Sequence, residues 1–218
     1  FAIDRAGLVP ADGETHQGVY DPAFLSEAGV PIYSPSNYAE LRYWLLRLVG
    51  PDYTGPQAIR YPRGGEVKAL AQYGCTGRAY DFLTGGPEAD TVLVSYGSEV
   101  EDVLAAAALL EAEGVPCRAC KLVKIFPFTD DFLHEIERFK TVLFAEECVR
   151  QGSIGQQLAA RLLADGWRGA FLHRAVDNTK LTHATVPELK EIQGLDAGSL
   201  AQAVRQALAA DQEKEQSR

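Results

Sequence analysis

The stretch Thr91-Val-Leu-Val-Ser-Tyr-Gly-Ser-Glu-Val100 joins two patterns that together decide the fold class. Thr91–Tyr96 is a short run of mostly apolar residues, which is typical of a strand buried on both faces. Gly97-Ser98 then leads into an apolar-rich segment, Val100–Glu113, which is long enough for a helix, and Gly114-Val-Pro116 ends it. A buried strand followed directly by a helix is the repeating unit of an α/β protein.

The same alternation continues toward the end of the chain. We expect strands at 118–123, 141–145 and 171–176, and helices at 130–139, 154–164, 187–192 and 199–209. Such alternation predicts a largely parallel sheet with right-handed crossovers. It defines a domain at 78–210, and the polar residues 211–218 are expected to be a disordered tail.

The first 65 residues form a separate block with similar elements. Strands are expected at 1–4, 30–33 and 57–61, a short helix from an Asp21 N-cap and Pro22, and a longer helix at 38–49. Residues 66–77 show no strong periodicity and are predicted to link the two domains. Because the chain opens as if a strand were already under way and contains no methionine, we expect it to be a piece of a longer protein.

Charge and hydropathy exclude several classes of protein. The 30 acidic and 21 basic residues give a net charge of −9, whereas a nucleic-acid-binding protein needs a broad basic face. The longest apolar run, Val103–Leu110, is far shorter than the roughly 20 residues that span a bilayer, and no basic segment leading into an apolar core opens the chain. We therefore expect a cytoplasmic protein without nucleic-acid or membrane partners.

Two cysteines, Cys117 and Cys120, have a spacing that suggests a metal or redox motif. They fall in a predicted strand, where residues three apart point to opposite faces, so the two sulfurs cannot bind one ion. We interpret both as small buried residues and predict no metal site.

The long loop after the first strand concentrates polar functional groups. Arg5, Asp12 and His16 lie among three glycines, which permit tight backbone turns and close approach of a ligand. A loop at the carboxyl end of a strand is where open α/β sheets bind ligands. His16 is the candidate for proton transfer, because an unperturbed imidazole titrates near neutral pH, and Asp12 could orient it or bind a substrate hydroxyl. An Asx-type turn with an incidental histidine explains the same residues equally well.

A second polar loop begins at Pro62, which ends the predicted strand at 57–61. Arg63 follows it and precedes two glycines, so its guanidinium fork is available for bidentate phosphate binding. An interdomain salt bridge is the alternative role for Arg63.

Two motifs of these loops occur together: Asp4-Arg-Ala-Gly7 with Asp12-Gly-Glu-Thr-His-Gln-Gly18 and Asp21, and then Arg60-Tyr-Pro-Arg-Gly64. In this combination and spacing, the chain resembles the 1-deoxy-D-xylulose-5-phosphate synthases of the transketolase superfamily. Weaker similarity continues, so that the resemblance covers essentially the whole chain, through Ser95–Ser98, Phe126-Pro127, Glu146-Glu147 and Gly194–Asp196.

The resemblance implies a three-domain enzyme. In the family, the first domain binds thiamine diphosphate and Mg²⁺ through Gly-Asp-Gly, the second binds the aminopyrimidine and supplies an activating glutamate, and the third is a carboxy-terminal α/β domain. The 218 residues contain neither Gly-Asp-Gly nor the glutamate segment. Residues 1–65 then correspond to the end of the pyrimidine-binding domain and 78–210 to the transketolase-type C-terminal domain. We expect no cofactor-binding or metal-binding residue in this chain, and no activity of the chain alone.

The family condenses pyruvate with D-glyceraldehyde 3-phosphate to 1-deoxy-D-xylulose 5-phosphate and CO₂, on the way to isoprenoids and thiamine. By resemblance, Arg5 and Arg63 hold the phosphate of the triose, and Asp12 and His16 contact the substrate as catalytic residues. The implied partners are these two substrates, the missing N-terminal part of the same enzyme, and a second copy in a homodimer.

Two other interpretations remain open at this point. A sugar transketolase or the β-chain of a 2-oxoacid dehydrogenase shares the third domain, but neither is expected to combine Asp-Arg-Ala-Gly with Tyr-Pro-Arg-Gly. A non-catalytic dimerisation or regulatory module is the alternative from a different class.

Overall fold

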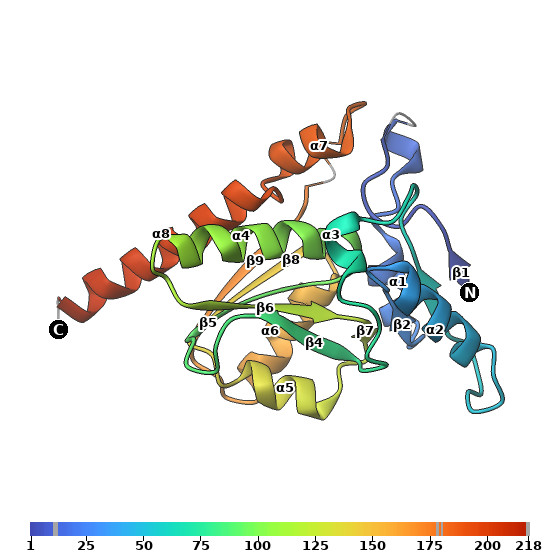
Figure 1. Ribbon diagram of the computed structural model, residues 1–218, viewed down its shortest axis with the longest axis horizontal. Helices are drawn as coiled ribbons and strands as arrows, with labels where there is room; N and C mark the ends of the chain where they lie inside the picture. Colours follow the sequence, from blue (N-terminus) through green and yellow to red (C-terminus); the bar gives the residue numbers. More distant parts are fainter. Residues whose placement is uncertain (11–12, 178, 180, 217–218) are drawn as a thin grey trace.

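The computed structural model describes residues 1–10, 13–177, 179 and 181–216. They form two β-sheets with helices packed around them (Figure 1). The smaller sheet has the strand order β1-β3-β2-β7, and the larger has the order β4-β6-β5-β8-β9. The smaller sheet positions the candidate site, and the larger sheet supports it.

The strands of the smaller sheet are short, with two or three residues each. β1 pairs in parallel with β3, and β3 with β2, whereas β7 joins β2 in the antiparallel direction from the second half of the chain. Its elements, with the helices that follow them, are β1 (Ala2–Ile3), α1 (Asp21–Glu27), β2 (Ile32–Tyr33), α2 (Tyr38–Leu48), β3 (Ala58–Arg60), α3 (Lys68–Ala71) and β7 (Lys124–Phe126).

The larger sheet is parallel except for its edge strand β4, which pairs antiparallel with β6. Its strands are β4 (Tyr80–Thr84), β5 (Thr91–Ser95), β6 (Cys117–Leu122), β8 (Thr141–Val149) and β9 (Ala170–Val176). Its helices are α4 (Val100–Ala112), α5 (Asp130–Ile136), α6 (Ile154–Ala164), α7 (Val186–Gln193) and α8 (Ala197–Gln216), and the short 3-10 turns are η1 (Glu14–His16) and η2 (Gly97–Glu99).

Both faces of the larger sheet are covered. Helices α4, α7 and α8 pack on one face, and α5 and α6 on the other (Figure 1). Side chains alternate along the strands, so that Leu93 points into the first core and Val92 and Val94 into the second. The predicted α/β class with a largely parallel sheet is confirmed.

The two cysteines of the Cys-Arg-Ala-Cys spacing lie in the two different cores. Cys117 packs beneath α4, and Cys120 packs on the opposite face of the same strand. Both are free and buried. Burial raises the pKa of the Cys117 thiol to about 11, which keeps it protonated near neutral pH. The predicted structural role of both residues therefore fits their surroundings.

Several elements differ from the sequence expectations. Strands β4 and β7 were not predicted, and β8 continues four residues beyond the predicted 141–145 strand, to Val149. The segment 66–77, predicted to be a linker, contains the short helix α3. Asp21 is the first residue of α1, whose N-cap is Tyr20, and its carboxylate binds Arg60 and does not cap the helix. Helix α8 continues to Gln216, through residues that we expected to be disordered.

A buried ion pair joins the two sheets. The ammonium of Lys121 on β6 contacts the carboxylate of Glu40 on α2, and it lies 3.7 Å from a carboxylate oxygen of Asp81. Lys121 and Glu40 are each 1% exposed. The Ser36 backbone N–H and hydroxyl donate to the other Glu40 oxygen at 2.9 Å each. Removal of one partner would leave a buried charge without its counterion.

We predict that Lys121→Ala lowers the free energy of unfolding by about 3–5 kcal/mol, because Glu40 then stays buried and uncompensated. The double variant Lys121→Met with Glu40→Gln should recover much of that loss, since neither charge remains. Urea unfolding measures both. Lys140→Ala, which removes an exposed partner of Asp90, is the control and should change the midpoint little. Equal losses in the Lys121→Ala and Lys140→Ala variants would contradict this account.

Candidate functional site

The two polar loops leave the smaller sheet at the same edge. Strands β1 and β3 are parallel and in register, with Ile3 opposite Arg60. The segments that follow stay together, because the Ala6 N–H donates to the Tyr61 carbonyl at 3.0 Å. The loops that carry Arg5 and Arg63 therefore begin side by side. Open α/β sheets bind ligands at this carboxyl edge of their strands.

Residues 6–18, which we call the glycine loop, close on themselves. Gly7 and Gly18 exchange two backbone hydrogen bonds, of 2.7 and 2.9 Å. Further along the loop, the amide of Gln17 accepts from the Val9 N–H at 2.7 Å and donates to the Val9 and Gly13 carbonyls at 2.9 and 3.2 Å. The buried Gln17 side chain thus connects Val9 and Gly13 across the loop, next to His16.

Glycine is required at both residues that close the loop. A Cβ at Gly18 would lie 1.9 Å from the Arg5 carbonyl oxygen. A Cβ at Gly7 would lie 2.1 Å from Oε2 of Glu147, and its φ of 83° is in the left-handed region. The backbone of Arg5 is also left-handed, with φ of 55°. Such conformations occur at ligand-binding sites, where the surrounding structure holds them.

The structure places the four predicted site residues unequally. Arg5 is half-buried at the root of the glycine loop, and Arg63 is exposed on the second loop. His16 ends η1 and is exposed, with Nδ1 3.1 Å from the Thr15 hydroxyl. Asp12 lies outside the described residues. The starts of the two loops are therefore brought together, and His16 lies on the glycine loop, which begins directly after Arg5.

Arg60 supports this edge, and the sequence analysis did not assign it a role. Its guanidinium is buried, donates to Asp21 Oδ2 at 2.7 Å and to the Gly18 carbonyl at 3.2 Å, and lies 5.3 Å from the centre of the Tyr96 ring. Burial alone lowers the pKa of Arg60, but the charge and hydrogen bond of Asp21, together with the nearby Tyr96, outweigh it and raise that pKa above its usual value. Both Arg60 and Asp21 belong to the motifs quoted in the sequence analysis, but no local sequence pattern predicts that the two residues form a pair.

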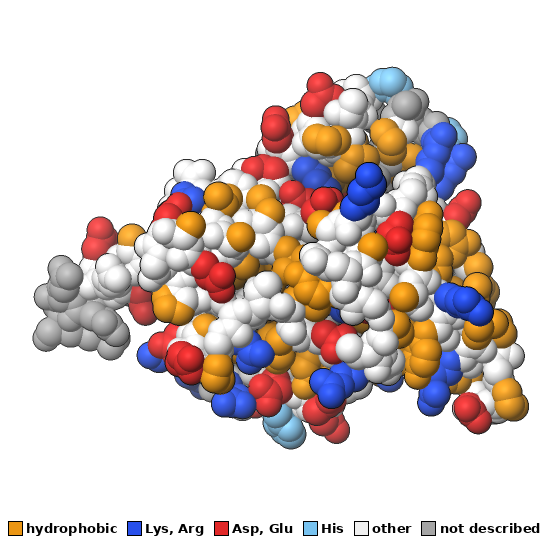
Figure 2. All heavy atoms as spheres, viewed as in Figure 1, with side chains coloured by type: hydrophobic (Ala, Val, Ile, Leu, Met, Phe, Trp, Pro, Cys, Tyr) orange, Lys and Arg blue, Asp and Glu red, His pale blue; other side chains and the backbone are white. Residues whose placement is uncertain are grey.

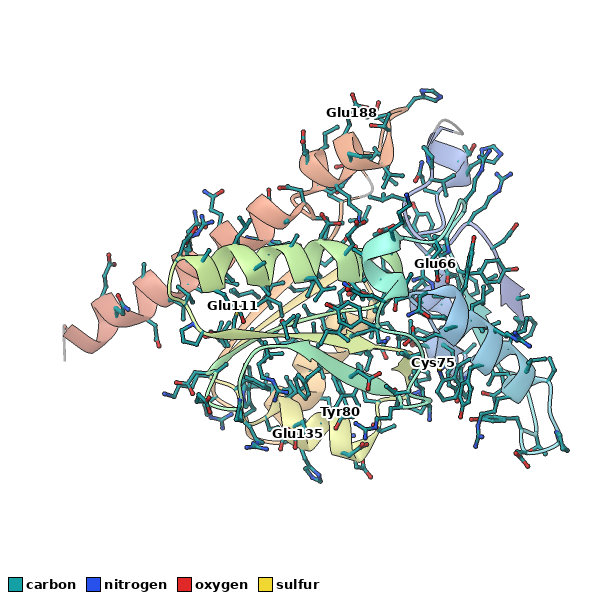
Figure 3. The ribbon with its side chains drawn as sticks, viewed as in Figure 1. Glu66, Cys75, Tyr80, Glu111, Glu135 and Glu188 are labelled. Atoms are coloured by element: carbon teal, nitrogen blue, oxygen red, sulfur yellow. The ribbon has the colours of Figure 1, made fainter. Side chains whose placement is uncertain are left out.

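A pocket of about 220 Å³ lies beside the second loop. It runs between the start of α2 and the residues flanking Arg63. Its rim includes Glu66, which accepts the Tyr38 N–H at 2.6 Å (Figure 3). The lining residues are mostly apolar: Pro35, Ser36, Asn37, Tyr38, Leu41, Tyr61, Pro62, Gly64, Gly65, Glu66, Val67 and Ser98. The site thus combines arginine-bearing loops with a neighbouring apolar cavity.

A Mg²⁺ centre needs several oxygen ligands close together. The described ranges contain no group of three or more His, Cys, Asp or Glu side chains that could hold a metal ion. Within the same ranges, no helix combines the length and apolar character of a membrane span.

Comparison with known families agrees with this architecture. Residues 84–200 match the family described as the transketolase C-terminal domain, and the chain belongs to that family. Its curated relatives carry a more specific name. The 1-deoxy-D-xylulose-5-phosphate synthase of Gloeobacter violaceus is 32% identical over 97% of this chain, and that of Geobacillus thermodenitrificans is 32% identical over 94%. The resemblance inferred from the two motifs is therefore confirmed.

The chain spans about a third of the length of these relatives, 34% of the first and 33% of the second. Among solved structures, the chain is similar to a split gene transketolase, described as an inactive beta4 tetramer. The TM-score is 0.80 with 25% sequence identity, over 95% of this chain and 66% of the other. The similarity thus extends beyond residues 84–200 to the smaller sheet. The boundaries at 65, 77 and 210 stay predictions.

We predict that Gly18→Ala distorts the root of the glycine loop, because the new Cβ collides with the Arg5 carbonyl. Overpacking of this kind costs about 1–3 kcal/mol, measurable as a lower midpoint of urea unfolding. Gly65→Ala is the matched control, since a Cβ there meets nothing within 4 Å. A Gly18→Ala variant as stable as Gly65→Ala would show that the loop does not hold this geometry.

Proposed function

We propose that this chain is the C-terminal part of a 1-deoxy-D-xylulose-5-phosphate synthase, which condenses pyruvate with D-glyceraldehyde 3-phosphate and releases CO₂. The observation that carries the proposal is the side-by-side departure of the Arg5 and Arg63 loops from one sheet edge. The names of the curated relatives support the same reaction. Its product would feed the isoprenoid and thiamine pathways in the cytoplasm.

The arginines supply what a triose phosphate requires. A guanidinium forms charge-assisted, bidentate contacts with phosphate oxygens. The net charge of −9 opposes anion binding by the surface as a whole. Cationic side chains at defined positions can still bind an anion locally despite the negative net charge. Arg5 and Arg63 occupy such positions at the two loops. They bind the phosphate and orient the aldehyde end of the substrate toward His16.

His16 supplies a proton. When the new carbon–carbon bond forms, the aldehyde oxygen of the triose becomes basic and takes up a proton. An exposed imidazole on the glycine loop, which follows Arg5 directly, is suited to donate it. Asp12, four residues earlier, is proposed to orient His16 or to bind a substrate hydroxyl. Gln17 limits the motion of this part of the loop through its bonds to Val9 and Gly13.

Thiamine diphosphate with Mg²⁺ supplies the electron sink for decarboxylation of pyruvate in the complete enzyme. Since the described residues do not fit a metal centre, we assign its binding to the rest of the enzyme. We accordingly propose that the chain acts only together with that part and is inactive alone.

An exposed apolar surface supports the existence of such a partner. Leu46 on α2 and Val49 directly after it are 62% and 76% exposed. Figure 2 shows hydrophobic side chains on the side of the molecule where α1 and α2 lie. A helix that is apolar on both faces is normally covered on both. We propose that the remaining part of the enzyme, in a homodimer, covers this surface.

A sugar transketolase is the second candidate, because the similar solved structure is a transketolase. The two functions differ in the donor substrate. Assays of the complete enzyme with pyruvate and with a ketose phosphate as alternative donors distinguish them, and turnover only with the ketose phosphate would overturn our proposal.

We predict that Arg63→Ala in the complete enzyme weakens the apparent affinity for glyceraldehyde 3-phosphate about 10- to 150-fold, because a charge-assisted contact is worth about 1.5–3 kcal/mol. The KM for pyruvate should change little. Steady-state kinetics with each substrate varied in turn measures both. Arg138→Ala, at an exposed arginine of the C-terminal domain, serves as the control. Equal losses for both substrates would indicate a structural role for Arg63.

We predict that His16→Ala lowers kcat of the complete enzyme about 10²- to 10⁴-fold, the usual contribution of an acid–base group. Its melting temperature should barely move, because the side chain is exposed. His134→Ala, at an exposed histidine on α5, should change neither quantity. Near-normal turnover with a lowered melting temperature would remove His16 from the mechanism.

A further inference from the structure

We propose that Glu147, on β8 of the C-terminal domain, is a positioning residue that fixes the glycine loop and, through it, Arg5 and His16. This inference rests on the roles proposed for those two residues. It assigns to the C-terminal domain a part in the reaction, although Glu147 need not touch substrate.

The carboxylate of Glu147 contacts the loop backbone directly. Its Oε2 accepts the Leu8 N–H at 2.7 Å. Its Oε1 accepts the Ser98 hydroxyl at 3.0 Å and lies 3.3 Å from Nζ of Lys190. The side chain is 4% exposed, and Gly7 leaves the space that it occupies. A charged acceptor with a buried N–H donor makes a strong, geometrically defined contact.

Lys190 on α7 makes a buried carboxylate possible at this place. Its Nζ also lies 2.9 Å from Glu99 and 2.5 Å from Asp102. Burial lowers the pKa of Lys190, but the surrounding carboxylates outweigh it and raise that pKa above its usual value. Lys190 therefore remains charged, and Glu147 shares this countercharge with Glu99 and Asp102. Glu147 thus receives its charge balance from α7 and directs its other oxygen to the loop.

The contact at Leu8 reaches the functional side chains through few covalent and hydrogen bonds. Leu8 is three residues from Arg5 in the chain. The next residue, Val9, makes two hydrogen bonds with the Gln17 side-chain amide: its N–H donates at 2.7 Å and its carbonyl accepts at 2.9 Å. Gln17 directly follows His16 in the chain. A shift of Leu8 therefore moves both ends of the loop.

A second contact shows that the C-terminal domain also holds the residue that directly follows the loop. The Val149 N–H donates to the Val19 carbonyl at 2.9 Å, and Leu8 and Val19 pack into the core beneath α4. Loss of the Glu147 carboxylate would release the Leu8 side of the loop and keep this second anchor. The fold should then persist while the loop loosens.

The first experiment measures kinetics of the complete enzyme. Glu147→Ala should raise KM for glyceraldehyde 3-phosphate and lower kcat, each about 10- to 100-fold, because small misplacements of catalytic groups have effects of this size. KM for pyruvate should stay unchanged. Glu147→Gln keeps an acceptor for the Leu8 N–H and should recover a large part of both losses. Glu188→Gln, at the start of α7 (Figure 3), is the control.

The second experiment measures amide hydrogen exchange in the 218-residue chain itself. Glu147→Ala should accelerate exchange in the peptide containing residues 5–18 and leave β5 and β8 protected as before. Ser98→Ala, which removes one partner of Glu147, should give a smaller acceleration in the same peptide. If Glu147→Ala does not fold, exchange of residues 5–18 in the Ser98→Ala variant tests the inference.

The outcomes separate this inference from the proposed function. If the wild-type enzyme does not make the expected product, the proposed function fails, and exchange alone decides whether Glu147 holds the loop. Wild-type kinetics in Glu147→Ala, or unchanged exchange of residues 5–18 in both variants, would overturn the inference. Faster exchange throughout β5 and β8 would also overturn it, because Glu147 would then support the whole domain and not the loop.

Discussion

The buried contact of Arg60 with Asp21 is the interaction on which this architecture depends. Taking both charges out of water costs several kcal/mol, and only good geometry with further hydrogen bonds repays it. Here the guanidinium also reaches the Gly18 carbonyl and lies beside the ring of Tyr96. These partners come from β3, α1, the glycine loop and the end of β5. The pair is therefore satisfied only when the smaller sheet, the loop and the larger sheet are assembled together.

The interface between the two sheets repeats this principle. Lys121 with Glu40 is a buried contact between the larger sheet and α2, and Glu147, which is paired with Lys190, is a buried contact between the larger sheet and the Leu8 N–H of the glycine loop. Hydrophobic packing alone would tolerate small shifts, because it is not directional. Hydrogen-bonded charges do not tolerate such shifts, since an unpaired buried charge is strongly unfavourable. A net-acidic protein can thus hold cationic groups at defined positions.

The site combines a rigid base with exposed reactive groups. Gly7, Gly18 and Gln17 close the loop, while His16 and Arg63 remain accessible to a ligand. Binding residues are often placed on loops that a rigid scaffold positions. The C-terminal domain supplies much of that scaffold. In our proposal it therefore contributes to the site by positioning the loop, although the cofactor is bound elsewhere.

The sequence by itself determined the α/β class, the long strands and helices, and the loops that carry Arg5, His16 and Arg63, because apolar periodicity, glycine and proline act locally. It also gave the family, through two motifs. The strands β4 and β7 escaped prediction, since β7 has three residues and β4 is only half-buried. Only the tertiary structure decided that β1 lies beside β3, that Asp21 binds Arg60, and that Glu147 holds Leu8 from 139 residues away. Such pairings depend on which segments pack together in space, and no local pattern encodes them.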